Sequence, residues 1–307
     1  MAFNKRNIGI LLVLASSVGF AIGPTAAKVA LDNGANTITV VTLRGAIGAA
    51  FLAMLIVAFR QSFRINADAL RWSLLCSLFT AFMVYGLIGA LSYIPVSMAI
   101  LIFFTHPIIV AVIMHWRGGD RLTPRKLVMA MGAFAGLALA IAPAFTRLEI
   151  TGIALAALAA VTICGAIICG ARAQQYATST QVNLYVTGTS SLAYAIIATG
   201  LGAWSLPVNA VGWIGVVGAG AGIALGLLTF FAAFRYLSPV RATVMGNVEP
   251  LLSILFAWVI LGERLQPVQW AGVAIMLGAI VLFETASPKD HADGLDHHKA
   301  KPERLEP

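Results

Sequence analysis

Charged residues are scarce in this sequence. Only 10% of its 307 residues are Asp, Glu, Lys or Arg, whereas 60% are hydrophobic. A chain of this composition has too few polar side chains to cover a water-facing surface, which excludes an ordinary soluble protein. The scarcity of charge therefore predicts an all-α integral membrane protein, with a lipid bilayer as its surroundings.

Cysteine is also rare, and Cys76, Cys164 and Cys169 all lie inside apolar runs. Such cysteines are predicted to be small packing residues rather than parts of a disulfide or a metal site. The sequence lacks a phosphate-binding glycine loop with its lysine, paired histidines at metal spacing and a nucleophile elbow. We therefore predict that the chain is not an enzyme and not an ATP-driven pump, and that it holds no cofactor or metal.

The few charges that are present are mostly basic, and the formal net charge is +8. No basic cluster with interleaved aromatic residues occurs, so a nucleic-acid partner is not predicted. If the N-terminus is cytoplasmic, sixteen of the 20 Lys and Arg residues fall on that side, and only Lys28, Arg147 and Arg264 fall on the other. This distribution predicts that both termini are cytoplasmic.

The chain contains a long internal repeat with an offset of 143 positions. Tyr93 matches Tyr236, and Pro107 matches Pro250. A closing motif, Gly-Asp-Arg-Leu-Thr-Pro, ends the first copy at Pro124 and returns in the second copy as Gly-Glu-Arg-Leu-Gln-Pro. A period of this length indicates a duplicated half rather than a solenoid unit.

Each half contains five apolar runs of about 20 residues, the length that crosses a bilayer as a helix. Because five is odd, the second half begins on the opposite side of the membrane, and the two repeats are inverted. Inverted repeats with a site near the bilayer midplane are typical of secondary transporters, although channels can share them. The first half covers 8–145, and its predicted spans are 8–28, 37–59, 72–92, 96–116 and 126–145. The second half covers 151–286, and its predicted spans are 151–171, 182–203, 211–235, 240–262 and 268–286. Residues 287–307 are predicted to be a disordered cytoplasmic tail.

His106-Pro107 and Glu249-Pro250 occupy equivalent positions, each in the middle of an apolar run. A charged side chain there costs at least about 2.5–3.5 kcal/mol, so it usually faces a cavity or a partner. The proline loosens the helix by withholding a backbone donor. Glu249 is therefore predicted to bind an ammonium group or a proton, and His106 to share that site; the alternative is that both only satisfy local polar groups.

Other polar and aromatic residues are predicted to line the same cavity. Arg44 lies roughly 10 Å into the second span at about 1.5 Å per residue. Its guanidinium could clamp a carboxylate, or it could extend to lipid headgroups or pair with an acidic side chain. Further predicted wall residues, each of which could equally serve packing, are Tyr85, Phe103, Asn247, Ser16 and Phe20. Together they suit an amphipathic small molecule better than a hydrated ion.

Glycines and prolines mark places where helices could move. Gly218 and Gly222 lie four residues apart on one helix face, which permits close helix packing or sliding between conformations. Pro24, near one end of the first span, has no counterpart in the second half, where Ile167 stands. We predict hinges or gates at Pro24, Pro107 and Pro250 as well as at the two glycines.

These features resemble the drug/metabolite transporter superfamily, in particular its ten-helix proteins with two EamA domains. The resemblance rests on the two repeats, Arg44, Pro107, Glu249-Pro250 and the closing motif, and it spans about residues 8–286. It implies a central cavity surrounded by the first four helices of each half, with the fifth and tenth helices to the side. The first half departs from the pattern, because His106 stands where the second half has Glu249.

Together, the residues and the resemblance predict a secondary transporter in a bacterial inner membrane that exports amino acids or related small amphipathic metabolites by alternating access. The alternative is uptake or exchange of a nucleotide-like or cofactor-like solute. A phosphorylated substrate would call for more cations in the cavity than Arg44 alone. Efflux driven by protons and facilitated diffusion both stay open, and a membrane scaffold or a lipid-modifying enzyme fits the inverted duplication poorly.

Overall fold

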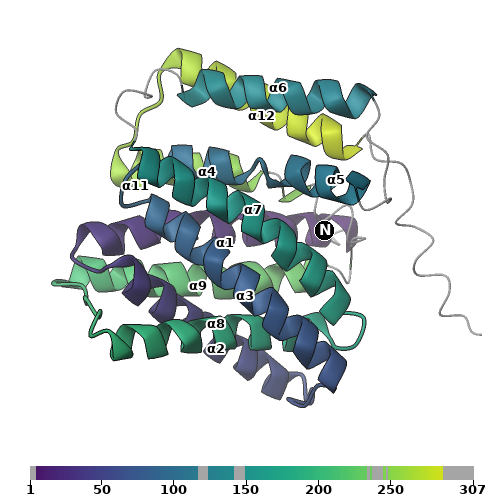
Figure 1. Cartoon of the computed structure of the whole chain (residues 1–307), viewed down its shortest axis with the longest axis vertical. Helices are drawn as coiled ribbons and strands as arrows, with labels where there is room; N and C mark the ends of the chain where they lie inside the picture. The colour runs from purple at the N-terminus through teal and green to yellow at the C-terminus, as the bar shows by residue number, and fades with distance from the viewer. Residues whose placement is uncertain are drawn as a thin grey trace, which may run out of the picture.

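The chain folds into long helices, and the described residues contain no strand. The computed structural model describes residues 5–116, 124–141, 149–233, 236, 245–246 and 248–285. The helices are α1 (Lys5–Asp32), α2 (Thr37–Ala58), α3 (Ala67–Ala90), α4 (Val96–Phe103), α5 (His106–Trp116), α6 (Pro124–Ile141), α7 (Ile150–Ala173), α8 (Ser179–Gly200), α9 (Ala210–Ala233), α11 (Glu249–Leu261) and α12 (Pro267–Thr285) (Figure 1).

Within the described part of the chain, five helices are long and apolar enough to cross a membrane, namely Asn7–Asp32, Thr37–Ala58, Ala67–Ala90, Ile150–Ala173 and Ala210–Phe230. Shorter apolar helices occupy most of the remaining predicted spans. The polar tail predicted at 287–307 lies outside the described residues. The predicted all-α, multi-pass membrane fold is confirmed.

The helix α8 is less apolar than these five, and its polar side chains bond to neighbouring helices. The Ser191 hydroxyl donates to the carbonyl of Thr42 in α2 at 2.8 Å, and the Thr189 hydroxyl donates to Ser77 in α3 at 2.7 Å. Polar groups at membrane depth require such partners, because lipid offers none. The predicted seventh span therefore keeps its polar residues inside the bundle.

Contacts between loops show which helix ends lie together. Asn36, between α1 and α2, bonds to the carbonyls of Ala203 and Ser205, between α8 and α9. Gly152, at the start of α7, lies against Tyr93 in the turn after α3. We call this side of the bundle the Asn36 end. Since α1 finishes at this end and its counterpart α7 begins there, the two repeats are inverted.

The opposite side, the Gln61 end, joins the loop between α2 and α3 to the start of α8. The Tyr185 hydroxyl donates to the carbonyl of Phe63 at 3.0 Å, and the Thr178 hydroxyl donates to the amide oxygen of Gln61 at 3.2 Å. Both halves therefore contribute to each end of the bundle, as two intertwined inverted units require.

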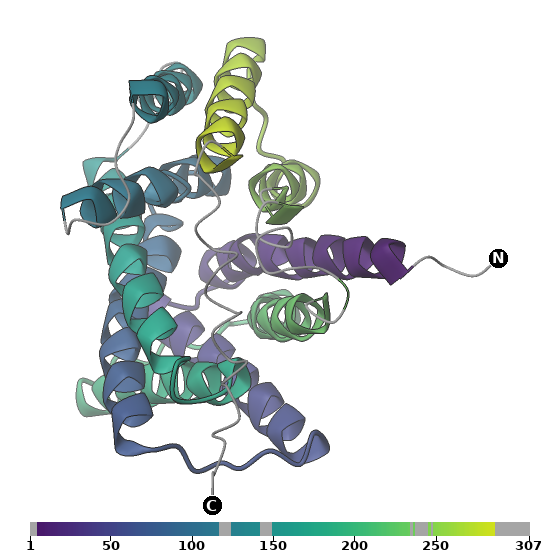
Figure 2. The same ribbon diagram turned by 90° about the vertical axis from the view of Figure 1, so that its right-hand side faces the viewer.

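Helix packing follows the same two-fold relation. The helix α1 packs along α9, and α3 packs along α7, so exchanging the halves converts one pair into the other. The pairs α2–α8 and α6–α12 convert into themselves, and α11 packs on α1 as α4 and α5 pack on α7. Figures 1 and 2 show α6 and α12 side by side at one edge of the molecule, as the resemblance implied.

Glycines set the distance between α1 and α9. A Cβ atom on Gly19 would lie 2.6 Å from the backbone nitrogen of Gly226, and one on Gly222 would lie 2.6 Å from the Gly19 carbonyl oxygen. Backbone atoms cannot move aside as a flexible side chain can, so only glycine permits this approach. Gly218, one turn earlier, faces the side chain of Ala26 more loosely, at 3.3 Å.

The fourth span differs from its prediction as one uninterrupted helix over 96–116. Its helix stops at Phe103 and restarts at His106, with Phe104 and Thr105 in a turn between α4 and α5. Pro107 has no N–H for the carbonyl four residues earlier, so the regular ladder fails at this point. The equivalent Pro250 is the second residue of α11.

Candidate functional site

His106 occupies the break between α4 and α5. Its Nδ1 atom lies 3.0 Å from the carbonyl oxygen of Phe103, the carbonyl that the missing N–H of Pro107 would otherwise have reached. Because a carbonyl only accepts, Nδ1 is the donor, and the neutral ring keeps its lone pair on Nε2. The imidazole therefore replaces the absent backbone donor and retains one nitrogen for another partner.

Aromatic rings and a thiol surround this break. The His106 ring is half-buried, with ring centres 5.0 Å from Phe103 and 5.7 Å from Phe104. From α7, the Cys164 sulfur lies 3.7 Å from the backbone carbonyl oxygen of His106 and 3.2 Å from that of Ala160 in its own helix. The predicted wall residue Phe103 thus contacts His106 directly, and α7 packs over the interruption.

Glu249 begins α11 and is half-buried. The start of a helix carries partial positive charge, which stabilises a carboxylate in the first turn. No described residue donates a hydrogen bond to this carboxylate. One turn later, Ser253 is fully buried, and its hydroxyl has no partner among the described residues. Asn247, the predicted neighbour of Glu249, lies outside the described residues.

Arg44 lies in α2 and is half-buried. Next to it, Gly45 packs against Ser191 of α8, where a Cβ atom would come within 2.9 Å of the serine side chain. The described residues include an ion pair between Lys28 and Asp32 at 2.8 Å, but none that involves Arg44 or Glu249. A substrate contact of Arg44 therefore stays a prediction, as does its extension to lipid headgroups.

Tyr85 is partly exposed and stacks on Tyr194, with ring centres 6.1 Å apart and planes 19° from parallel. The Tyr194 hydroxyl donates to the carbonyl of Ala81 at 2.7 Å, which fixes the ring that Tyr85 covers. This pair joins α3 to α8. No described contact connects it to His106.

Ser16 and Phe20 belong to the packing of α1. Ser16 is fully buried, and its hydroxyl donates to the carbonyl of Val13 in its own helix at 2.8 Å. The Phe20 ring meets Phe230 edge-on at 6.5 Å between ring centres and lies over Gly226. Pro24 lies inside α1, which continues beyond it to Asp32. Gating and substrate roles of these residues stay predictions.

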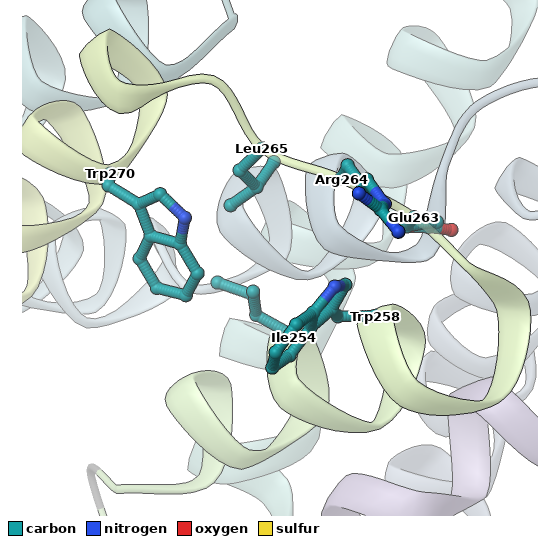
Figure 3. A pocket seen from close by; sticks show the side chains of 6 residues that line it. All are labelled: Ile254, Trp258, Glu263, Arg264, Leu265 and Trp270. Atoms are coloured by element: carbon teal, nitrogen blue, oxygen red, sulfur yellow. The ribbon is translucent and has the colours of Figure 1, made fainter.

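A cavity of about 230 Å³ lies elsewhere, near the Asn36 end, where α11 meets α12 (Figure 3). Its lining is Ile254, Trp258, Glu263, Arg264, Leu265 and Trp270. None of these residues was predicted as a site residue. Glu263 was predicted only as part of the closing motif. The recurrence of an acidic residue at that position in both copies could have indicated a role for its side chain.

Tyr194 and Cys164 were also not predicted. Tyr194 lies in the polar seventh span, and the repeat offers no signal for it because its counterpart is Phe51. Cys164 was predicted to be a packing residue, and its contact with the His106 carbonyl follows only from how α7 crosses the break.

Comparison with known proteins agrees with this architecture. The sequence matches the family model described as EamA-like transporter family twice, over residues 7–142 and 150–285. No curated protein matches the chain. A solved structure described only as "Crystal structure of protein" aligns with 90% of this chain and 96% of that chain, with a TM-score of 0.63 and 17% sequence identity. Likeness at this identity shows a shared fold.

Proposed function

Because the chain belongs to the EamA-like transporter family, and is thus a multi-pass membrane transporter of the drug/metabolite type, we propose that it exports amino acids or related small amphipathic metabolites. The observation that carries this proposal is the placement of His106 and Glu249. Each stands at the first residue of a helix that starts within a predicted span. Helix starts inside a membrane are a common way to build a transporter's substrate site.

The two helix starts are chemically complementary to an amino acid. The start of α5 carries partial positive charge, which suits a carboxylate, and the His106 ring donates to such a carboxylate from Nε2 when that nitrogen is protonated. Glu249 supplies the negative charge that an ammonium group requires. Phe103 and Phe104, which flank the His106 ring, offer an apolar surface for a side chain.

Alternating access is proposed from the inverted packing. The main helix pairs recur with exchanged roles, as α1–α9 does in α3–α7 and α2–α9 does in α3–α8, so the same chain can close either end of the bundle by equivalent movements. With the excess of Lys and Arg at the Gln61 end, we place that end and both termini in the cytoplasm of a bacterial inner membrane. Export then proceeds toward the Asn36 end.

The test is counterflow of labelled amino acids in proteoliposomes that contain the wild type or Glu249→Gln. Loss of a charge-assisted hydrogen bond costs about 1.5–3 kcal/mol, so flux should fall roughly 10- to 100-fold in the variant. Glu149→Gln is the matched control, because Glu149 is exposed, precedes α7 and makes no side-chain cap bond.

Repeating the assay with and without an imposed proton gradient separates antiport from facilitated diffusion. A dependence on the gradient that disappears in Glu249→Gln would assign proton carriage to this carboxylate. Undiminished amino-acid flux in Glu249→Gln would remove Glu249 from the mechanism.

A further inference from the structure

The loop between α11 and α12 starts with Gly262, whose backbone conformation only glycine adopts without strain. Gly262 has φ +72°, in the left-handed region. Its N–H donates to the carbonyl of Trp258 at 3.1 Å, and the N–H of Glu263 donates to that of Ala257 at 3.2 Å. This sharp stop closes α11 and places the Glu263 side chain just beyond the helix end.

From there the Glu263 carboxylate reaches the other half of the protein. One oxygen accepts from the N–H of Val96 at 2.7 Å, and the other accepts from the N–H and the hydroxyl of Ser97 at 3.0 and 2.6 Å. These are the first residues of α4, and the preceding Pro95 provides no side-chain cap. Glu263 therefore caps a helix that lies more than 160 positions earlier in the chain.

The chemistry makes this a strong contact. The first N–H groups of a helix have no partner within the helix, and its partial positive charge attracts a carboxylate. All three bonds are charge-assisted, and the side chain is half-buried, so water competes less for its oxygens. The Gly-Glu of the second closing motif thus has a physical role: the glycine turns the chain, and the carboxylate holds α4.

The cap ties together the two helices that lead to the proposed site. From Val96, α4 runs to the break before His106, and from Leu261, α11 runs back to Glu249. These two helices also pack on each other. We propose that Glu263 is a positioning residue whose carboxylate clasps α4 to α11 at the Asn36 end, and that this clasp must release when the bundle opens at that end. The release step rests on the alternating-access mechanism proposed above.

The direct measurement is the distance between α4 and α11. Spin labels are attached to cysteines introduced at Ser92, in the turn that leads into α4, and at Val259 in α11, and both positions are exposed. Pulsed electron paramagnetic resonance then reports the separation of the start of α4 from α11. The three native cysteines are buried, and the chain without added cysteines provides the labelling blank. Samples in liposomes need no substrate, so this readout is independent of which solute is carried.

Graded variants predict graded results. The wild type should show mainly the short distance. Glu263→Gln should move most of the population to longer distances, because its amide nitrogen cannot accept from Ser97. Ser97→Ala removes one of the three bonds and should move a smaller share. Glu263→Asp keeps both acceptor oxygens and should lie between Glu263→Gln and the wild type. Glu149→Gln, which removes the same charge at the same end, should leave the distances unchanged.

Transport provides a second, separate readout. Since Glu263 does not touch the proposed substrate site, Glu263→Gln should change the maximal flux by roughly threefold or more and leave KM within about twofold. A distance distribution in folded Glu263→Gln identical to that of the wild type would overturn the clasp. Should that variant not fold, unchanged distances in both Ser97→Ala and Glu263→Asp would do the same. If the wild type shows no amino-acid counterflow but the variants still shift the distances as expected, the proposed substrate is wrong and the clasp is not affected.

Discussion

Two helix interfaces that the repeat makes equivalent are built from different residues. Between α1 and α9, Ile22 lies against Gly222, where a Cβ atom would come within 2.9 Å of the isoleucine side chain. At the matching positions of α3 and α7, Phe79 lies against Gly165, where a Cβ atom would come within 2.6 Å of the ring. In both contacts the large residue belongs to the first half and the glycine to the second.

The two-fold fold is therefore maintained by pairs of residues and not by single positions. The repeat makes Ile22 equivalent to Gly165 and Phe79 equivalent to Gly222, so neither position keeps its side chain. What persists is a large side chain packed over a glycine of the opposite helix. Packed interiors tolerate such exchanges when the total volume is preserved.

The largest effect is expected when that balance is broken. Gly165→Ile alone drives a branched side chain into the Phe79 ring and should destabilise the protein by about 1–3 kcal/mol. Adding Phe79→Gly copies the Ile22–Gly222 arrangement and should recover at least half of the loss. Chemical unfolding in mixed micelles measures both variants. Gly200→Ala, a site with nothing within 4 Å, is the control. Equal losses in the single and double variants would show that the two interfaces are not interchangeable.

The sites of Pro107 and Pro250 are also equivalent in the repeat but carry different side chains before the proline. In the first half, the His106 ring donates to the carbonyl that Pro107 leaves free, whereas the equivalent Glu249 is ionisable and, as a carboxylate, can only accept. The imidazole thus repairs its own helix break, and the carboxylate cannot do so while ionised. This difference separates a residue with one committed nitrogen from one whose two oxygens accept no hydrogen bond from the described residues.

A double-mutant cycle tests whether the His106 ring replaces the backbone donor that Pro107 lacks. His106→Ala leaves the Phe103 carbonyl without its imidazole donor and should cost about 1–2 kcal/mol of stability. In a Pro107→Ala background a backbone N–H becomes available to that carbonyl, so the same substitution should cost much less. Unfolding free energies of the four proteins measure the coupling. The same loss in both backgrounds would contradict the proposed replacement of the backbone donor.

The smallest effect concerns an aromatic pair that only one side of the fold has. At the positions equivalent to Tyr85 and Tyr194 stand Leu228 and Phe51. Tyr194→Phe keeps the stacked ring and loses the bond to the Ala81 carbonyl. We expect a loss of about 1 kcal/mol in unfolding free energy. The matched control is Tyr85→Phe, for which no hydroxyl bond is described; if it destabilised the protein equally, stacking and not the hydrogen bond would hold Tyr194.

Much of the fold was predictable, because its causes are local or periodic. Apolar runs of bilayer length, the offset between matching residues and the odd number of spans predicted a membrane protein with inverted repeats, and this prediction is confirmed. Pro107 also predicted a loosened helix, but it did not predict that the helix would stop and restart two residues later. The candidate site is different: the positions of His106 and Glu249 follow from the sequence, but their roles and those of the other predicted residues stay predictions.

From the sequence alone it follows that this chain lies in a membrane, that its two halves are inverted and that two prolines loosen matching spans. These follow from residue types and their spacing, which act along the chain. Which groups satisfy the polar atoms exposed at the break before His106 and at the helix ends follows only from the packing of the helices. His106 bonds to a carbonyl three residues away, but the start of α4 is capped by Glu263 from the other half. No local pattern encodes that second contact, because it depends on how two distant helix ends meet when the inverted halves pack together.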